Sequence, residues 1–244
     1  MPVPPVLNVY IGYDPREREA FEVCQKSIVR HISTAVHIVP LTLARLRHAG
    51  LYRRDHETVA GQDRDIISDA PMSTEFAISR FLTPILAQTG YALFMDCDML
   101  VRADLAELFA LADPRYAVQV VKHDHKPAED LKMDGQLQTT YARKNWSSAM
   151  LWNCDHPGAR DLTLRMVNTW PGRRLHAFRW LKDHEIGELP AAWNWLEGTS
   201  DPAIEPKIVH YTRGGPWLQN WRHVAYADEW LAEAADMQRA RVVA

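Results

Sequence analysis

The sequence has little cysteine. Its 244 residues include only Cys24, Cys97 and Cys154, which are odd in number and far apart. Neither a disulfide framework nor a zinc site with closely paired ligands fits this spacing. We therefore expect reduced thiols in a cytoplasmic protein.

Long apolar runs and an excess of basic charge are also missing. No stretch approaches the roughly 20 apolar residues needed to span a bilayer. Residues 1–10 lack the basic and apolar segments of a secretory signal, although a peripheral contact with a membrane surface stays open. Lysine and arginine number 28 against 31 aspartates and glutamates, a formal net charge of -3. No basic field attracts nucleic acid, so nucleic acid is not expected as a partner.

Apolar residues are plentiful, at 47% of the chain, and their spacing predicts an α/β domain. Residues 6–11 form a β-rich run that ends at Gly12, and residues 36–39 predict a second strand. Between them, a helical pattern places five residues on one face: Ala20, Phe21, Cys24, Ile28 and Ile32. This order favours a parallel sheet with right-handed crossovers, whose carboxyl edge is the usual ligand site.

The rest of the chain gives weaker patterns. Residues 53–69 are polar and aperiodic, which indicates a loop able to order on binding. Helices are predicted at 74–88, 105–111, 157–168 and 224–239, and strands at 91–95, 99–101, 116–121, 149–153 and 208–210. Ser73 can cap the first of these helices, and Pro84 should bend it. Residues 170–198 give a mixed pattern.

Two acids follow the predicted strand at 91–95. Alternate residues of an extended segment point the same way, so Asp96 and Asp98 present two carboxylates on one side while Cys97 faces the other. Two nearby negative charges favour a cation. Oxygen ligands suit Mg²⁺ or Mn²⁺, which complete their shells with water and substrate phosphates. Two acids at a strand end can also simply cap the next turn, so the motif needs support from elsewhere in the sequence.

A family resemblance gives that support. Arg80 precedes an apolar strand that ends in the two acids and further apolar residues, which resembles the family-eight glycosyltransferases, retaining enzymes of the GT-A fold. Three later segments are similar to further motifs of that family, in the same order: 146–153 to its asparagine-serine-glycine strand, 183–185 with 193–194 to its acidic acceptor-side motif and tryptophan-asparagine pair, and 208–217 to its late histidine motif. The resemblance covers most of residues 75–217.

The resemblance implies a fold and an activity. The fold is α/β, a single GT-A-like domain over 1–244 with a mainly parallel twisted sheet flanked by helices. Residues of about 1–101 would bind the nucleotide, and about 102–222 would bind the acceptor and complete the metal site, before a C-terminal helix at about 224–239. The implied activity is metal-dependent transfer of a hexose from a nucleotide diphosphate sugar, with a UDP-sugar favoured, to an acceptor hydroxyl with retention of configuration. A glycan, a lipid-linked molecule or a protein remains open as the acceptor.

Roles for single residues follow from the same resemblance. His210 becomes the third metal ligand beside the two acids, for Mn²⁺ or Mg²⁺. Arg80 is expected near the diphosphate, where its planar guanidinium can stabilise the leaving phosphate. Asp183 and Glu185 are candidates for the position beside the reacting sugar carbon, which gains oxocarbenium character.

Other residues are expected to contact the nucleotide sugar. The candidates at the end of the first strand, for base and ribose, are Tyr10, Gly12, Tyr13 and Asp14. The candidates for the sugar and the phosphates are Arg80, Asp96, Ser147, Ser148 and Arg213. The family usually has a lysine where this chain has Gly215, so Arg213 is the possible replacement.

Three rival functions stay open. A haloacid dehalogenase-type phosphatase also places two acids after an apolar strand, but Leu100 and the late position of the motif argue against it. A nucleotidyltransferase would share the sheet and the metal, although no glycine-rich basic loop follows the first strand. A non-catalytic sugar-nucleotide-binding protein would share every motif, and turnover distinguishes the glycosyltransferase from it. Residues 122–126 hold ligand-type side chains, but consecutive strand positions face opposite ways, so a sugar contact fits them better than a second metal.

Overall fold

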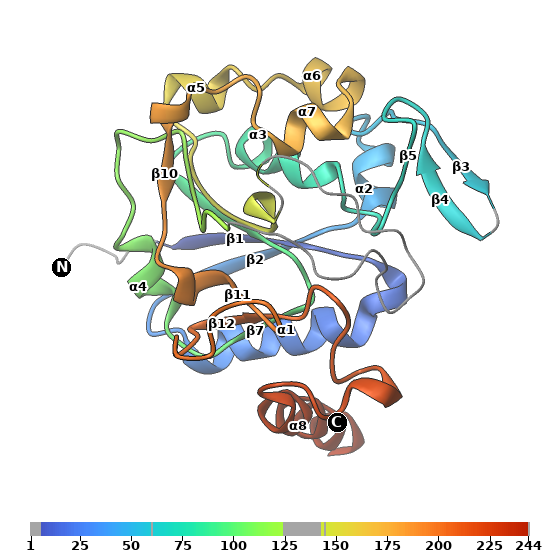
Figure 1. Cartoon of the computed structure of the whole chain (residues 1–244), viewed down its shortest axis with the longest axis vertical. Coiled ribbons are helices and arrows are strands. Elements are labelled where there is room, and N and C mark those ends of the chain that lie inside the picture. Colours follow the sequence, from blue (N-terminus) through green and yellow to red (C-terminus); the bar gives the residue numbers. More distant parts are fainter. Residues whose placement is uncertain (1–5, 60, 124–142, 144, 244) are drawn as a thin grey trace.

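The computed structural model describes residues 6–59, 61–123, 143 and 145–243, which fold into a central sheet with helices on both sides (Figure 1). The strands of the sheet, in spatial order, are β10 (Ile186–Glu188), β8 (Val118–Val120), β9 (Ala149–Asn153), β6 (Tyr91–Met95), β1 (Leu7–Gly12) and β2 (Val36–Leu41). Only β9 runs antiparallel to its neighbours within this sheet. The mainly parallel sheet is therefore confirmed.

Helices cover both faces of the sheet. One side carries α1 (Arg18–His31) and, beyond it, α8 (Ala227–Val243). The other side carries α3 (Thr83–Ala87), α5 (Pro157–Arg160), α6 (Leu164–Thr169) and α7 (Gly172–His176). Two further helices are α2 (Leu43–His48) and α4 (Leu105–Phe109). Short 3-10 helices connect the elements: η1 (Pro15–Glu17), η2 (Ser79–Leu82), η3 (Trp146–Ser148), η4 (Asp183–Glu185), η5 (Ala191–Asn194) and η6 (Gln219–Trp221).

The first β-α-β unit confirms the pattern of the sequence. β1 pairs in parallel with β2 along its whole length, and with β6 on its other side. The apolar face of α1 is buried at Ala20, Phe21, Cys24 and Ile28, while Ile32 ends the helix and packs against the core. Burial of this face stabilises the helix far more than intrinsic propensity does.

A second, three-stranded sheet joins the acids to the late histidine. It consists of β11 (Trp195–Leu196), β12 (Ile208–His210) and β7 (Met99–Val101). β12 runs antiparallel to β7 with His210 opposite Met99, and the backbone N–H of Tyr211 donates to the carbonyl of Asp98 at 3.0 Å. This register places residues from distant parts of the chain beside one another.

The expectation of a loop at 53–69 is wrong. The segment contributes to a third, antiparallel sheet of β3 (His56–Val59), β4 (Gln62–Asp65) and β5 (Ala70–Pro71). Arg54 Nη2 lies 2.5 Å from Asp65 Oδ2 in a fully buried pair, and Arg54 Nη1 donates to the carbonyls of Val167 and Trp170. A buried charge is tolerated when it is paired and hydrogen-bonded, so the polar composition serves a buried network.

Two predicted helices are broken in the structure. Residues 74–88 form turns, η2 and the short α3, in which Pro84 lies in the first turn and sacrifices no helical hydrogen bond. Residues 157–168 form α5 and α6 as separate helices, because the Thr163 side chain accepts from the N–H of Met166 and starts α6 anew.

The predicted C-terminal helix is confirmed as α8, which packs along α1. Trp230 of α8 is buried in an apolar cluster that includes Val23 of α1. Arg30 of α1 forms ion pairs with Glu233 and Asp236 of α8. Among the described residues, no helix is both long enough and apolar enough to cross a membrane.

Candidate functional site

Three ligand-type side chains converge at the carboxyl end of β6. Asp96 and Asp98 follow this strand, and His210 is the last residue of β12. One possible ligand atom from each residue lies within 4.8 Å of the others. His210 Nε2 is 3.2 Å from Asp98 Oδ1 and 3.9 Å from Asp96 Oδ2. The structure therefore brings the three expected metal ligands together.

Burial dominates the electrostatics of Asp96. It raises the pKa of the carboxyl to about 6, and the charge of Asp98 adds to the rise while Arg80 opposes it. Two carboxylates shielded from water repel each other, and a cation would relieve this repulsion. Two carboxylates and an imidazole are a ligand set that suits Mn²⁺, and carboxylate oxygens also suit Mg²⁺.

Arg80 is fixed beside the acid pair by contacts on every side. Its Nη1 lies 2.8 Å from Asp96 Oδ1 and donates to the carbonyl of Ser147 at 3.0 Å. Its Nε donates to the carbonyl of Ala77 at 3.1 Å, and the guanidinium carbon lies 5.3 Å from the centre of the Phe76 ring. A cation held in this way is preorganised, because it needs no rearrangement when negative charge develops nearby.

The amide of Asn194 links His210 to the loop behind the acids. Its Oδ1 lies 2.9 Å from His210 Nδ1, and its Nδ2 donates to Ser148 Oγ at 2.9 Å. The carbonyl of Ser148 accepts from the backbone N–H of Asp96 at 2.9 Å. Asn194 appeared in the sequence only as part of a family resemblance, since nothing local indicates its partners.

Ser147 has a different neighbour. Its hydroxyl lies 2.7 Å from His176 Nδ1. Burial, together with the charge of Arg80, lowers the pKa of His176 to about 3. His176 is therefore neutral at physiological pH, beside the serine whose carbonyl holds Arg80.

The end of β1 packs closely against the neighbouring turn. Tyr10 is buried, and a Cβ added at Gly12 would lie 2.4 Å from the Phe76 ring, so only glycine fits there. Tyr13 is partly exposed and meets Phe21 edge to face, with ring centres 5.1 Å apart. Of these expected nucleotide contacts, Tyr13 has the most accessible side chain.

Asp14 is occupied by the protein itself. Its carboxylate accepts from the backbone N–H groups of Arg16 at 2.9 Å and Glu75 at 3.0 Å, and it forms an ion pair with the Arg16 guanidinium. These hydrogen bonds outweigh the effect of burial and lower the pKa of Asp14. Asp14 thus caps η1 and anchors the turn that precedes η2.

The two acids expected beside the sugar share one turn, the 3-10 helix η4, which directly precedes β10. The backbone carbonyl of Glu185 accepts from Ala117 just before β8, and its carboxylate accepts from the N–H of Lys182. Because β10 is parallel to β6, Glu185 lies at the amino edge, opposite the acid pair. The carboxylate of Asp183 is 91% exposed and lies 2.5 Å from Arg143 Nη2. The structure therefore places η4, and with it both acids, at the amino edge, away from the metal ligands.

Arg213 is turned toward its own loop. Its Nη2 lies 3.4 Å from Glu197 Oε2, and its guanidinium carbon lies 5.4 Å from the centre of the Trp221 ring. A Cβ added at Gly198 would lie 2.1 Å from Nη2, so Gly198 leaves the room that this side chain needs. A phosphate would have to compete with Glu197 for this charge.

Two cationic side chains lie against the ring of Trp146 at the carboxyl edge. Lys122 Nζ lies 5.7 Å from its ring centre, and the guanidinium carbon of Arg143 lies 5.4 Å from it. The indole N–H donates to the carbonyl of His123 at 3.1 Å. The remaining residues of the 122–126 segment lie outside the described part of the chain: Asp124, His125 and Lys126.

Glu17 is a further acid that sequence reasoning missed. Burial raises its pKa to about 8, and the charge of Asp98 adds to the rise. The thiol of Cys97 donates to Glu17 Oε2 at 3.4 Å. An acid in the first turn of a helix is ordinary in sequence, and only the packing of α1 under the acid pair distinguishes this one.

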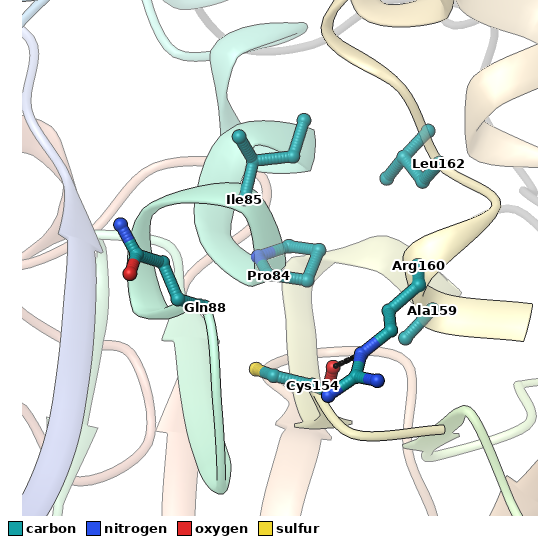
Figure 2. Close-up of a pocket in the computed structure, with 7 residues that line it drawn as sticks. All are labelled: Pro84, Ile85, Gln88, Cys154, Ala159, Arg160 and Leu162. Atoms are coloured by element: carbon teal, nitrogen blue, oxygen red, sulfur yellow. Dashed lines mark hydrogen bonds between the residues drawn. The ribbon is translucent and has the colours of Figure 1, made fainter. Parts of the chain in front are cut away.

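A hollow of about 280 Å³ lies at the opposite edge of the sheet (Figure 2). One wall comes from α3, at Pro84 and Ile85, and from Gln88 just after this helix. The other comes from the segment after β9, where Arg160 Nε donates to the carbonyl of Cys154. Because β9 is antiparallel to β6, this segment lies at the amino edge. The hollow is therefore separate from the acid pair.

The fold places this protein in a structural class. WbbM, a bifunctional glycosyltransferase, superposes with a TM-score of 0.61 at 17% identity over 96% of this chain. GlyE of Streptococcus pneumoniae TIGR4 gives 0.59 at 16% over 94%, and the galactosyltransferase LgtC, solved with donor and acceptor sugar analogues, gives 0.56 at 12% over 94%. This chain spans 50% of WbbM, 60% of GlyE and 96% of LgtC. The protein has the GT-A-like glycosyltransferase fold that its sequence predicted.

A closer relative is protein CDI of Arabidopsis thaliana, which is 46% identical over 239 residues, covering 96% of this chain and 88% of the relative. This chain belongs to the family of protein CDI. No protein-family model matches the sequence. Membership of the family-eight glycosyltransferases stays a prediction.

Proposed function

We propose that this protein is a metal-dependent glycosyltransferase that moves a hexose from a nucleotide diphosphate sugar to an acceptor hydroxyl. The observation that carries the proposal is the convergence of Asp96, Asp98 and His210 in a protein with a glycosyltransferase fold. The triad lies at the carboxyl edge of β6, and open α/β sheets bind their ligands at this edge. The family-eight resemblance supports retention of configuration.

Mn²⁺ or Mg²⁺ is the proposed cofactor. Asp96 and Asp98 would hold it through carboxylate oxygens, and His210 through Nε2, because Nδ1 already faces Asn194. When bound, such an ion acts as a Lewis acid on the diphosphate leaving group. Its coordination shell normally includes substrate phosphates and water besides a few protein ligands.

Arg80 is the proposed stabiliser of the departing phosphate. The guanidinium lies against Asp96, and the Arg80 side chain is only 8% exposed, so little water screens its charge. Its hydrogen bonds to the backbone carbonyls of Phe76, Ala77 and Ser147 fix its direction. As negative charge grows on the leaving oxygen, a cation that is already in place lowers the energy of the transition state without reorganisation.

The family resemblance alone supports Asp183 as the carboxylate near the reacting sugar carbon, because η4 lies at the amino edge of the sheet. Asp183 is exposed, and its partner Arg143 packs against Trp146, which directly precedes the two serines proposed to contact the sugar. The acceptor hydroxyl would attack from the side of the leaving group, and the departing phosphate oxygen would take its proton. No dedicated general base is then needed. Glu185 lies in the same turn, and neither acid gains support for a catalytic role from that position.

A UDP-sugar is the proposed donor. LgtC, which was solved with donor and acceptor sugar analogues, supports a donor and an acceptor site in this fold. Residues of about 1–101 would bind the nucleotide, with Tyr13 as its most accessible aromatic contact, and about 102–222 would bind the acceptor. The acceptor hydroxyl would belong to a glycan, a lipid-linked molecule or a protein.

A thermal-shift screen of nucleotide sugars with and without Mn²⁺ tests the proposal. A ligand that binds only the folded state raises the melting temperature by mass action, so one donor should raise it, and only when Mn²⁺ is present. Release of nucleoside diphosphate from that donor, faster when an acceptor is added, would establish transfer. Metal-dependent binding without release would instead favour a non-catalytic sugar-nucleotide-binding protein. No metal-dependent shift with any donor would refute the proposal.

A further inference from the structure

We propose that an arginine-rich surface over α6 and α7 docks the protein on a membrane that contains acidic phospholipids. This surface, the arginine face, consists of Arg53, Arg165, Arg173, Arg174 and Arg179. It lies outside the candidate metal site. Docking does not depend on the proposed function, because it needs neither a metal nor a nucleotide sugar.

Two segments of the sequence supply the arginine face. Residues 43–54 and 157–179 together contain nine arginines, no lysine and a single acid, Asp161. The whole chain carries a formal net charge of -3, so the positive charge of these segments is a local excess. A planar guanidinium binds phosphate oxygens in pairs, which lysine cannot do. The composition therefore favours a partner that presents phosphates.

Contacts between the two segments hold them together. The backbone N–H of Arg53 donates to Asn168 Oδ1 of α6 at 2.6 Å. The buried Arg54 donates to the carbonyl of Val167 at 2.9 Å and to that of Trp170 at 2.8 Å. The exposed arginines therefore stand on one packed base, although they come from parts of the chain that are more than a hundred residues apart.

The side chains of the arginine face carry unneutralised charge. All five are exposed, and none forms an ion pair with another residue that the structure describes. Exposed arginines elsewhere are paired, since Arg18 lies 3.0 Å from Glu22 and Arg115 lies 2.6 Å from Asp113. A cation without an internal partner is available to an external anion.

An aromatic ring lies within the arginine face. The guanidinium carbon of Arg174 is 4.1 Å from the centre of the Trp170 ring, and the backbone N–H of Arg179 donates to the carbonyl of Arg174 at 3.0 Å. Trp170 is partly exposed. Tryptophan is enriched where lipid headgroups meet water, because its ring is apolar and its N–H is polar. Arginines around such a ring suit the surface of a phospholipid bilayer.

On the opposite side of the sheet, charges of both signs neutralise one another. α8 lies on that side (Figure 1), and its acids Glu233 and Asp236 pair with Lys26 and Arg30 of α1. A negative surface potential therefore attracts the arginine face more strongly than it attracts α8. This difference orients α6 and α7 toward the bilayer.

A bilayer fits this charge distribution better than a nucleic acid does. The arginine face spreads over α6, α7 and the segment after α2, so it is broad, and a bilayer presents its phosphates over a broad surface. A nucleic acid carries its charge along a line and would also meet the net negative charge of the remaining chain. The two partners can be separated by experiment.

The arginine face adjoins the candidate site. His176 ends α7, and its Nδ1 lies 2.7 Å from Ser147 Oγ, while the Ser147 carbonyl accepts from Arg80. Docking through α7 would therefore hold the carboxyl edge of the sheet near the lipid headgroups. A lipid-linked acceptor would then be within reach of that edge, a consequence that, unlike docking, rests on the proposed function.

Sedimentation with lipid vesicles tests the docking. The wild type, without metal or nucleotide, should bind vesicles of phosphatidylcholine mixed with phosphatidylserine and should not bind vesicles of phosphatidylcholine alone. Raising the salt concentration from about 0.1 M to about 1 M shortens the Debye length from about 10 Å to about 3 Å and should release the protein. A short RNA duplex, measured at the lower salt concentration, is the alternative polyanion.

The face variant removes three of the unpaired charges by combining Arg165→Gln, Arg173→Gln and Arg179→Gln. Each basic residue near an acidic membrane strengthens binding by roughly 5-fold, so this variant should bind the acidic vesicles about 100-fold more weakly. Its melting temperature should match that of the wild type, because the replaced side chains are exposed and form no ion pair.

The matched control has the same net charge but keeps the arginine face intact. It combines Arg18→Gln, Arg115→Gln and Arg222→Gln, which replace exposed arginines outside the two segments. The control should bind the acidic vesicles as the wild type does. A non-specific effect of net charge would instead weaken both variants equally.

Three results would overturn the inference: a wild type that does not bind the acidic vesicles, a face variant that binds them as tightly as the control, or tighter binding to the RNA duplex than to the vesicles. The last result would assign the arginine face to nucleic acid. If the face variant does not fold, Arg173→Gln alone, with an expected loss of roughly 5-fold, decides the outcome. Failure of the proposed function looks different, because a protein without metal-dependent donor binding would still bind the vesicles.

Discussion

The two edges of the central sheet bury different kinds of groups. At the carboxyl edge the side chains of Arg80 and Asp96, which form an ion pair, are only 8% and 13% exposed. At the amino edge Asp155 and Arg160 also pair, but their side chains are 53% and 60% exposed, and the hollow beside them has mainly apolar walls (Figure 2). Burying charge costs free energy, so proteins concentrate buried, coupled charges where chemistry needs them. This contrast favours the carboxyl edge as the functional one, whereas the fully buried Arg54–Asp65 pair serves the packing of the fold.

Replacing one acid at each edge gives the largest expected effect. Asp98→Asn removes a ligand charge from the triad and should weaken Mn²⁺-dependent binding of a nucleoside diphosphate by at least roughly 100-fold, more than the loss of an outer partner costs. Asp155→Asn, at the amino edge, should bind as the wild type does. Calorimetric titration of both variants in Mn²⁺ checks the pair. Equal affinities for the two variants would remove the distinction between the edges.

Replacing one arginine at each edge should lower turnover at the carboxyl edge only. Arg80→Ala removes a preorganised cation and should lower turnover by roughly 100-fold, with a smaller loss of donor affinity, because the charge matters most as the leaving phosphate becomes more negative. It also leaves Asp96 without its partner, which should lower the melting temperature. Arg160→Ala should change neither by much, since exposed pairs contribute little. Steady-state kinetics on both variants separates these cases. A loss in donor affinity alone would make Arg80 a simple clamp.

The pH dependence of metal binding should follow Asp96. Its raised pKa of about 6 means that the carboxyl takes up a proton as the pH falls through this value, and the proton competes with the ion. Mn²⁺ affinity should therefore fall by up to about tenfold per unit below about pH 6. Titrations at several pH values give the profile. Affinity that stays flat down to about pH 5 would place Asp96 outside the coordination shell.

His176 should give a smaller effect, on stability in acid. Its pKa is lowered to about 3 in the folded protein, so below its ordinary value the unfolded chain binds a proton that the folded chain does not. Stability from this group is therefore complete above about pH 6.5 and declines as the pH falls, by up to about 1.4 kcal/mol per unit. His176→Gln should lose less stability on acidification than the wild type. Chemical denaturation at about pH 7 and about pH 4.5 measures the difference. An identical decline in both proteins would contradict the buried, neutral state of His176.

Sequence reasoning succeeded where the signal is local. The alternation around Asp96 and Asp98, the apolar face of α1 and the strand that ends at His210 depend on neighbours in sequence, and the structure confirms these elements. Family resemblance then pointed to the pairing of distant segments. The metal that these residues would hold stays a prediction.

Sequence reasoning failed where the partners of a residue lie on distant parts of the chain. The segment that contains Arg54 and Asp65 resembles a loop in sequence because it is polar. In the fold, these polar residues form an ion pair and hydrogen bonds with buried partners. Asn194 and Glu17 gain their significance from side chains on other elements. The position of Glu185 depends on the order of strands in the sheet, which no local pattern specifies.

Two histidines offer the most direct test of the central claim, that side chains from distant segments hold one ion. His210 faces the acid pair, whereas His156 caps α5 at the amino edge by accepting from the N–H of Gly158 at 3.0 Å. Both are engaged in hydrogen bonds, so His210→Ala and His156→Ala should each melt earlier than the wild type without metal. Only His210→Ala should also lose Mn²⁺ affinity, by roughly 10-fold to 100-fold. An early-melting His210→Ala that binds Mn²⁺ as tightly as His156→Ala would contradict the three-ligand site.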